Sequence, residues 1–274
     1  MKKHLLFLSV PILTALTVTA CGTESNTLWE NASPETSALT FYIYDGKSSR
    51  QLMMFDNTES NKLLSELSSE NVKSVEDIPD DEITLPVYGI DISDKNGCPL
   101  SALWTNGYLI MQNGNIYKYD HDLSHIEDKY TWESTNEYEN KIYLPCADIL
   151  ARGDKGWLSD YLNRSENTAA QDGLSYEITG FENNTLKTRL TNNNDTPFIY
   201  GEHYSLQVQL EGIWYDVPAR SDNNYCFIDI AYELSGNSSA ELTHSLEPFG
   251  QLPHGRYRIC KETLSAEFNV PYTE

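Results

Sequence analysis

The C-terminal third of the sequence is a regular succession of short strand-like runs, and this pattern constrains the fold more than any other feature. Polar or glycine-containing turns, such as Asn192 to Asp195 and Glu211-Gly212, separate the runs. Seven or eight short strands at this spacing are typical of an antiparallel β-sandwich, so we expect one over residues 174–272. The expected strands are residues 174–181, 185–191, 203–210, 213–217, 226–234, 239–245, 256–261 and 264–270.

Side-chain alternation within these runs predicts which faces are buried. Leu206, Val208 and Leu210 share one face of their strand. Gln207 and Gln209 share the other face, and we expect that face to lie in water. The pattern therefore indicates strands with one side in the core and one side in solvent.

A series of short motifs follows the same region in order. They are Asn192 with Pro197-Phe198-Ile199-Tyr200-Gly201, Tyr204-Ser205-Leu206, Gly212-Ile213-Trp214-Tyr215-Asp216-Val217-Pro218, Ala231-Tyr232, and Gly255-Arg256-Tyr257-Arg258-Ile259 with Lys261. Their order and spacing resemble a family of bacterial Ig-like domains seen in cell-surface lipoproteins. The resemblance implies an Ig-like sandwich without enzymatic activity, and it supplies no ligand. Tyr257 is a candidate tyrosine corner, its hydroxyl bonded to nearby backbone.

Strand-like and helical patterns both occur in residues 40–163, which predicts a small α+β domain whose family the motifs do not identify. A polar boundary, residues 163–173, separates it from the sandwich. The expected elements are a hairpin from residues 39–44 and 51–55, a helix capped by Thr58 and carrying Leu63, Leu64 and Leu67, a strand over residues 87–92, and short helices at residues 147–151 and 157–162.

The dipeptide Asn113-Gly114 lies between two alternating runs and predicts a hairpin with a two-residue turn. Opposed residues of such a hairpin share a face. This register places Tyr108, Ile110, Tyr117 and Tyr119 on one face, and Leu109, Met111 and Ile116 on the other. Both faces are apolar, so we expect the strand pair to be covered on both sides.

The surroundings of these two faces can also be predicted. The aliphatic face should meet the helix that bears Leu63 and Leu67. The three tyrosines are then a candidate recognition surface, whose rings would stack on a sugar or a peptide. The alternative, which we favour, is that they pack against the segment containing Trp157 and Tyr161, because buried rings are commoner than bare ones.

The first twenty residues have the features of an export signal. Lys2 and Lys3 precede a mostly apolar run that is shorter than the roughly 20 residues of a membrane-spanning helix. The run ends in Val18-Thr19-Ala20-Cys21, which resembles the lipobox of bacterial lipoproteins. The resemblance implies cleavage before Cys21, a lipid on its thiol and extracytoplasmic anchoring to the cell membrane. Residues 21–38 are polar and predict a flexible tether.

The charge balance is strongly acidic, with 41 acidic and 19 basic side chains and a formal net charge of −22. Loss of Lys2 and Lys3 with the signal peptide changes this charge from −22 to −24. Affinity for phosphate backbones needs clustered Lys and Arg, so we expect no nucleic-acid partner. The expected partners are the membrane, through the lipid, and a protein or an envelope glycan.

The cysteines that follow Cys21 are divided equally between the two halves of the chain. None lies in a C-x-x-C pair, so the spacing does not indicate a zinc ribbon or a thioredoxin-type site. Outside the cytoplasm disulfides are permitted, and free thiols are the rival state. We expect at most two intradomain disulfides, Cys98–Cys146 and Cys226–Cys260.

The densest polar cluster contains His121 and His125, which are four residues apart and have acidic neighbours. On a helix this spacing would place both imidazoles on one face, where they could hold zinc. The sequence shows no third ligand, and a solvated turn after the hairpin is the simpler interpretation. We therefore expect neither a metal nor another cofactor.

Three functions are compatible with these features. We favour a non-enzymatic, membrane-anchored lipoprotein that binds or scaffolds at the cell surface. The second is a carbohydrate or small-ligand receptor that uses exposed aromatic side chains. The third is a hydrolase in the N-terminal domain, for which the sequence offers no Gly-x-Ser-x-Gly, Ser-x-x-Lys or Walker motif.

Overall fold

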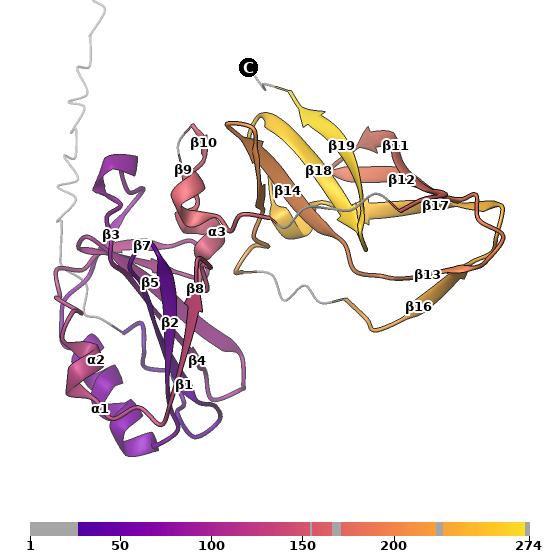
Figure 1. Cartoon of the computed structure of the whole chain (residues 1–274). Helices are drawn as coiled ribbons and strands as arrows, with labels where there is room; N and C mark the ends of the chain where they lie inside the picture. The colour runs from indigo at the N-terminus through magenta and orange to yellow at the C-terminus, as the bar shows by residue number, and fades with distance from the viewer. Residues whose placement is uncertain (1–26, 154, 166–170, 223–226, 272–274) are drawn as a thin grey trace, which may run out of the picture.

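A computed structural model describes residues 27–153, 155–165, 171–222 and 227–271, and shows two β-rich domains (Figure 1). An α+β domain precedes an antiparallel sandwich, which confirms the predicted fold class. Cys21, the signal peptide, Cys226 and residues 21–26 of the predicted tether lie outside the described residues. The prediction of a flexible tether is wrong for residues 27–38, because Trp29 is buried and Ala32 forms a β-bridge with Asp94. Among the residues that the structure describes, no helix is both long enough and apolar enough to cross a membrane.

The first domain is built on one eight-stranded sheet in which all neighbours are antiparallel. The strand order is β3-β7-β6-β5-β4-β1-β2-β8. The strands are β1 (Leu39–Tyr44), β2 (Ser48–Met54), β3 (Lys73–Val75), β4 (Val87–Ser93), β5 (Pro99–Thr105), β6 (Tyr108–Met111), β7 (Ile116–Lys118) and β8 (Ser134–Glu139). The predicted hairpin is β1–β2, whereas β3, β5 and the polar edge strand β8 were not predicted.

Two helices, α1 (Asn57–Leu67) and α2 (Ile126–Lys129), lie on one side of this sheet (Figure 1). The predicted cap of α1 is wrong by two residues, because the Asp56 carboxylate accepts a hydrogen bond of 2.9 Å from the Glu59 amide. We call the buried set beneath the helices the helix-side core. It contains Trp29, Leu39, Phe41, Ile43, Leu52, Met54, Leu63, Leu64, Leu67, Val72, Ile90, Ile92, Ala102, Trp104, Leu109, Met111, Tyr119, Leu123 and Ile126.

The β6–β7 hairpin has a three-residue turn rather than the predicted two-residue turn. Met111 donates its amide to the Asn115 carbonyl over 2.9 Å, and the strands pair Tyr108 with Lys118 and Leu109 with Tyr117. Gly114 has φ +84°, which is typical of a type I turn followed by a left-handed residue. A one-residue shift in register moves every side chain of one strand to the opposite face relative to its partner strand.

The predicted face assignments change accordingly. Leu109 and Met111 lie in the helix-side core with Leu63 and Leu67, as expected, and Tyr117 packs against that core. Ile116 instead lies on the opposite face with Tyr108 and Ile110. Both faces of the hairpin are covered, as predicted, but the three tyrosines do not share one face.

The opposite face of the sheet is covered by the segment that leads toward the second domain. This segment contains α3 (Ala147–Leu150), the short pair β9 (Arg152–Gly153) and β10 (Gly156–Trp157), and the 3-10 turn η2 (Ser159–Tyr161). The predicted helix at residues 147–151 is present as α3. The predicted helix at residues 157–162 is not formed, because its first residue belongs to β10 and only a single 3-10 turn follows. A further 3-10 turn, η1 (Asp80–Glu82), lies in the acidic loop.

The second domain is an antiparallel sandwich, with a three-stranded sheet β11-β12-β17, a four-stranded sheet β15-β14-β18-β19 and a separate pair β13-β16. A 3-10 turn, η3 (Glu247–Phe249), follows β17. The strands are β11 (Leu174–Glu182), β12 (Thr185–Asn192), β13 (Phe198–Gly201), β14 (Ser205–Leu210), β15 (Ile213–Asp216), β16 (Ala231–Leu234), β17 (Ser238–Ser245), β18 (Gly255–Lys261) and β19 (Leu264–Val270). Of these, β13 was not predicted, and β16 is shorter than expected.

Burial on β14 follows the predicted alternation with one exception. Leu206 and Val208 face the core, but Gln207 is only 6 % exposed and not in water as predicted. Its amide nitrogen donates to Asp216 Oδ1 over 2.9 Å, and its oxygen accepts from Arg258 Nε over 2.5 Å. The guanidinium of Arg258 lies 4.4 Å from the centre of the Trp214 ring, so a polar layer covers this outer face.

The two domains share one continuous set of buried side chains, which we call the shared core. Trp157 Nε1 donates to the Tyr257 hydroxyl over 2.9 Å, and that hydroxyl donates to the Pro253 carbonyl over 2.7 Å, as expected for a tyrosine corner. The shared core contains Tyr44, Ile78, Val87, Leu103, Tyr108, Ile110, Ile116, Cys146, Leu150, Ala151, Trp157, Tyr161, Leu162, Tyr176, Leu186, Leu190, Tyr200, Tyr204, Leu206, Val208, Tyr215, Val217, Leu234, Leu246, Phe249, Leu252, Tyr257, Ile259, Leu264, Ala266 and Phe268.

Candidate functional site

The predicted tyrosine surface is not formed. Tyr108 is 4 % exposed, and its hydroxyl donates to the Glu82 carboxylate while Lys118 Nζ lies 3.6 Å from the ring centre. Tyr119 is 1 % exposed and donates to the Leu67 carbonyl over 2.9 Å. Tyr117 is half-buried against the helix-side core. The favoured alternative holds for Tyr108, which shares a core with the Trp157 segment; the hypothesis of a sugar- or peptide-stacking surface on these rings is dropped.

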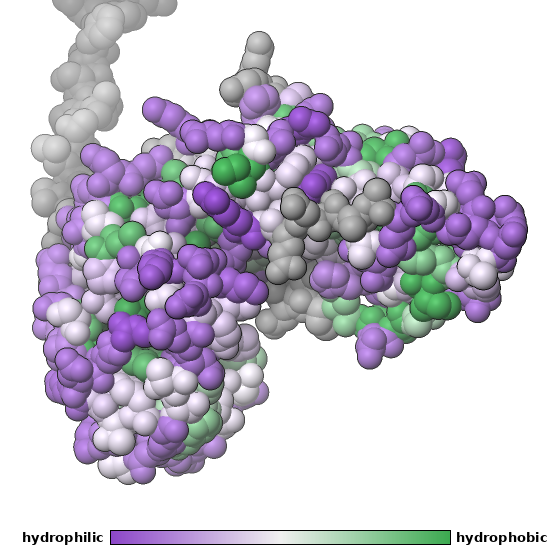
Figure 2. Space-filling model, in the orientation of Figure 1, coloured by the Kyte–Doolittle hydropathy of each residue, from purple (hydrophilic) through white to green (hydrophobic). Residues whose placement is uncertain are grey.

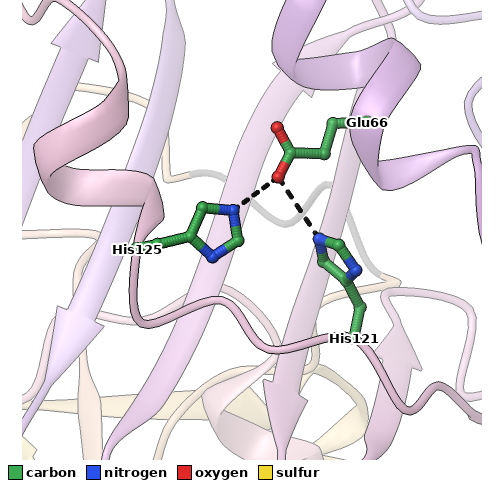
Figure 3. A group of neighbouring side chains, drawn as sticks. All are labelled: Glu66, His121 and His125. Atoms are coloured by element: carbon green, nitrogen blue, oxygen red, sulfur yellow. Dashed lines mark hydrogen bonds and ion pairs between the residues drawn. The ribbon is translucent and has the colours of Figure 1, made fainter.

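The structure does bring His121 and His125 together, and it adds Glu66 from the last turn of α1 (Figure 3). Glu66 Oε1 lies 2.6 Å from His125 Nε2 and 3.3 Å from His121 Nε2. The two imidazole ring centres are 5.7 Å apart. The histidines lie on the loop between β7 and α2 and not on one helix face, so the loop conformation, rather than helical spacing, makes them converge.

The Glu66 carboxylate is charged and well held. Its Oε2 accepts a hydrogen bond of 2.5 Å from the Tyr130 hydroxyl and is paired with Lys129 Nζ. Burial raises the pKa of Glu66, but the hydrogen bonds from Lys129, Tyr130 and the two imidazoles outweigh burial and lower the pKa to about 2. The carboxylate is therefore ionised at neutral pH.

Sequence reasoning missed Glu66 for a physical reason. The residue precedes Leu67 on α1, far from the histidines along the chain, and no local spacing connects the two segments. In the sequence, Glu66 is only an acidic residue beside the buried face of an amphipathic helix. Such residues are common on helices and do not indicate a metal ligand. Tertiary packing of α1 onto the sheet creates the cluster.

A second concave site lies where the two domains meet, and we call it the junction cleft. It encloses about 490 Å³, and its walls include Tyr42, Asp91, Tyr143 and Ser221. Ser101 Oγ donates to Asp91 Oδ1 over 2.9 Å. Burial raises the pKa of Asp91 although the hydrogen bond from Ser101 lowers it, so this carboxyl group is easier to protonate than an exposed one.

The predicted disulfide between Cys98 and Cys146 is not formed, and both thiols are free. Cys98 is exposed on the turn between β4 and β5, where its amide donates to Asp94 Oδ1 over 2.9 Å. Cys146 is buried beside the junction cleft, and burial raises the pKa of its thiol, which disfavours the nucleophilic thiolate. Cys260 is also a free, buried thiol. The predicted pairing with Cys226 involves a residue outside the described part of the chain.

Comparison with known proteins identifies only the second domain. Residues 171–272 match the sequence model of a family described as a bacterial Ig-like domain. Comparisons with curated proteins and with solved structures found no match. The match supports the resemblance seen in the strand motifs, and the C-terminal sandwich is accordingly an Ig-like domain.

Proposed function

We propose that this protein is an extracytoplasmic lipoprotein, anchored to the cell membrane through Cys21, that binds or scaffolds a protein partner without catalysis. The lipobox-like sequence and the polar segment after it support the anchor. The Ig-like domain supports the role of a surface or scaffolding module. Both domains contribute to the shared core, which supports a protein that binds its partner as one rigid unit rather than as two separate modules.

Exposed apolar side chains around the β13–β16 pair of the Ig-like domain carry the binding proposal. Ile199, Ile228 and Ile230 are 55 %, 58 % and 42 % exposed, and Tyr232 on β16 is 38 % exposed. Figure 2 shows a group of apolar residues over the β13–β16 pair, within a largely polar surface. Exposed apolar patches of this kind mark interaction surfaces on soluble domains. Ile199 pairs with Glu233, whereas Tyr232 pairs with Tyr200, so Ile199 and Tyr232 lie on opposite faces of the β13–β16 pair. We call these four exposed residues, which surround the pair, the β13–β16 patch.

Anchoring is tested by the Cys21→Ser variant in the producing cells. The parent chain is expected to incorporate labelled fatty acid and to partition into detergent, whereas Cys21→Ser incorporates none. Cys98→Ser is the matched control, because Cys98 is an exposed thiol that should not be acylated. Equal labelling of the parent and Cys21→Ser chains would contradict the anchor.

Binding is tested by site-specific photo-crosslinking on intact cells. A photoreactive side chain at Ile199 is expected to give a discrete adduct with one envelope protein. The same group at Arg189, an exposed residue on β12, is the control and should give none. Equal adduct patterns from both positions would count against the patch as a specific surface.

A second candidate function is a small-ligand or carbohydrate receptor, and the junction cleft favours it. Tyr143 is 41 % exposed at the cleft and lies 4.4 Å, centre to centre, from the Tyr138 ring. An exposed ring beside polar groups such as Asp91 suits sugar stacking. Among the described residues that line the cleft, Asp91 is the single acidic one, so the paired carboxylates of glycoside hydrolysis do not meet there. Glycan binding abolished by Tyr143→Ala would favour this receptor.

A further inference from the structure

We propose that Glu66, His121 and His125 bind one divalent transition-metal ion, for which Zn²⁺ is the expected occupant. The ligand atoms that these residues offer lie within 4.8 Å of one another. Two imidazoles and one carboxylate are a donor set that zinc sites use with water in the remaining position. The site lies in the first domain and is independent of the proposed partner-binding function.

The carboxylate of Glu66 is oriented for this role. Lys129 and Tyr130 both bond Oε2 and leave Oε1 toward the two imidazoles. Oε1 faces the Nε2 atoms of His121 and His125, so three donors point at one small volume (Figure 3). Lys129 neutralises part of the carboxylate charge, which limits the affinity but fixes the geometry.

His121 also has a carboxylate near its other ring nitrogen, at an ion-pair distance. Its Nδ1 lies 3.7 Å from Glu70 Oε1. When the ion takes the Nε2 lone pair, the remaining ring proton is on Nδ1 and faces that carboxylate. A carboxylate behind a ligating imidazole fixes the ring and increases its basicity. At 3.7 Å and with its side chain 51 % exposed, Glu70 supports the ring only weakly.

Exposure of the cluster permits entry of the ion and of water. The side chains of Glu66 and His121 are 12 % and 19 % exposed, and that of His125 is 40 % exposed. Solvent can therefore reach the cluster from the side of His125. The two imidazole donors favour zinc, copper or nickel over magnesium and calcium, which prefer oxygen ligands. Any proton that an imidazole carries on Nε2 leaves to bulk water as the metal–nitrogen bond forms.

The test is a calorimetric titration of the purified, chelator-treated full chain with Zn²⁺ at neutral pH. We expect one ion per chain and loss of binding in His121→Ala and His125→Ala. His125→Ala is the primary variant, since His125 is the most exposed of the three and its loss should leave the fold intact. Circular dichroism and a thermal melt without zinc verify folding.

Two matched controls separate this site from other zinc ligands. His203→Ala removes an exposed histidine of the Ig-like domain, and Cys98→Ser removes the exposed thiol, and both should bind as the parent chain does. Glu70→Gln should lower the affinity by about 10-fold at most without abolishing binding. Absence of zinc binding at millimolar concentration, or binding unchanged in His125→Ala, would overturn the proposal.

Cobalt gives an independent readout of the ligand set. Co²⁺ added to the parent chain should produce visible d–d absorption that His125→Ala and Glu66→Gln remove. Excess Zn²⁺ should displace the cobalt and bleach the band. A cobalt spectrum that persists in both variants would place the ion elsewhere and overturn the assignment.

Discussion

The two faces of the eight-stranded sheet are closed in different ways. One face is covered by the domain's own helices, and its helix-side core contains residues of the first domain and Trp29 of the preceding segment, but none of the Ig-like domain. The other face is covered by the α3–η2 segment, and its shared core continues into the Ig-like sandwich. The first domain thus completes one core alone and the other together with its neighbour. The Ig-like domain is therefore part of the packing of the first domain.

The largest expected loss of stability comes from replacing Trp157 in the shared core with alanine. This residue is 8 % exposed, and it stacks on Arg152 at 4.8 Å and bonds Tyr257. Trp157→Ala should lower the free energy of unfolding by about 3–5 kcal/mol, because a buried ring is replaced by a cavity. Urea unfolding followed by tyrosine and tryptophan fluorescence measures the change.

Leu67→Ala is the matched variant in the helix-side core, where Leu67 is fully buried. It should cost about 2–5 kcal/mol and leave the domains docked, since its neighbours belong to the first domain alone. Trp157→Ala should in addition increase the radius of gyration measured by small-angle scattering. Equal scattering curves for the two variants would show that the docking does not depend on the shared core.

A pH-dependent loss of stability is expected from His244 on β17. Tyr176 and Thr188 lie 2.8 Å and 3.0 Å from its Nε2. Burial, reinforced by the nearby Lys261 and opposed by Glu202, lowers the pKa of His244 from 6.5 to about 4. The folded state therefore resists protonation, and its stability is fully present above pH 6.5 and falls as the pH drops toward 4.

The shift in the His244 pKa corresponds to roughly 3 kcal/mol between these pH values, from about 1.4 kcal/mol for each pKa unit. Urea unfolding at pH 7, 5.5 and 4 measures the dependence. His244→Gln should show a flatter profile than the exposed control His203→Gln, which should follow the parent chain. A profile of His244→Gln as steep as that of the parent would assign the loss to other groups.

Most strands of the Ig-like domain were predictable because alternation and turns are local signals. β12, β17 and β19 begin and end within one residue of their expected limits. The β6–β7 register was not predictable, since Asn-Gly suits both a two-residue turn and a three-residue turn with glycine last. The side chains of this strand pair lie in both cores, and those contacts are not encoded in the turn sequence.

The candidate metal site was half predicted for a similar reason. His121 and His125 are visible as a local pair, whereas Glu66 joins them only because α1 packs on the sheet beside their loop. Gln207 shows the same limit, because its alternation predicts exposure while the neighbouring strands supply Asp216 and Arg258 as partners. Long-range partners decide these sites, and spacing does not encode them.

Removing one buried tyrosine hydroxyl from each core should lower the free energy of unfolding by different, smaller amounts. Tyr257→Phe leaves both the Trp157 indole N–H and the Pro253 carbonyl without this partner. Tyr119→Phe affects one acceptor, the Leu67 carbonyl. Each lost hydrogen bond costs about 1 kcal/mol, so Tyr257→Phe, which loses two, should be the more destabilising in urea unfolding. The reverse order would mean that the Trp157–Tyr257 bond contributes little.

The smallest expected effect is at the hairpin that serves both cores. Gly114 has φ +84°, and a Cβ added there would meet nothing within 4 Å, so the cost of Gly114→Ala is conformational and not steric with neighbours. A left-handed conformation costs an L-residue about 1–2 kcal/mol, which thermal unfolding should detect. Gly114→Asn should recover much of the loss, because asparagine tolerates this conformation. The φ of Asn113 is not positive, so Asn113→Gly should not cause the loss of stability expected for Gly114→Ala. If Asn113→Gly instead stabilised the hairpin strongly, a two-residue turn with both residues left-handed would be the better description.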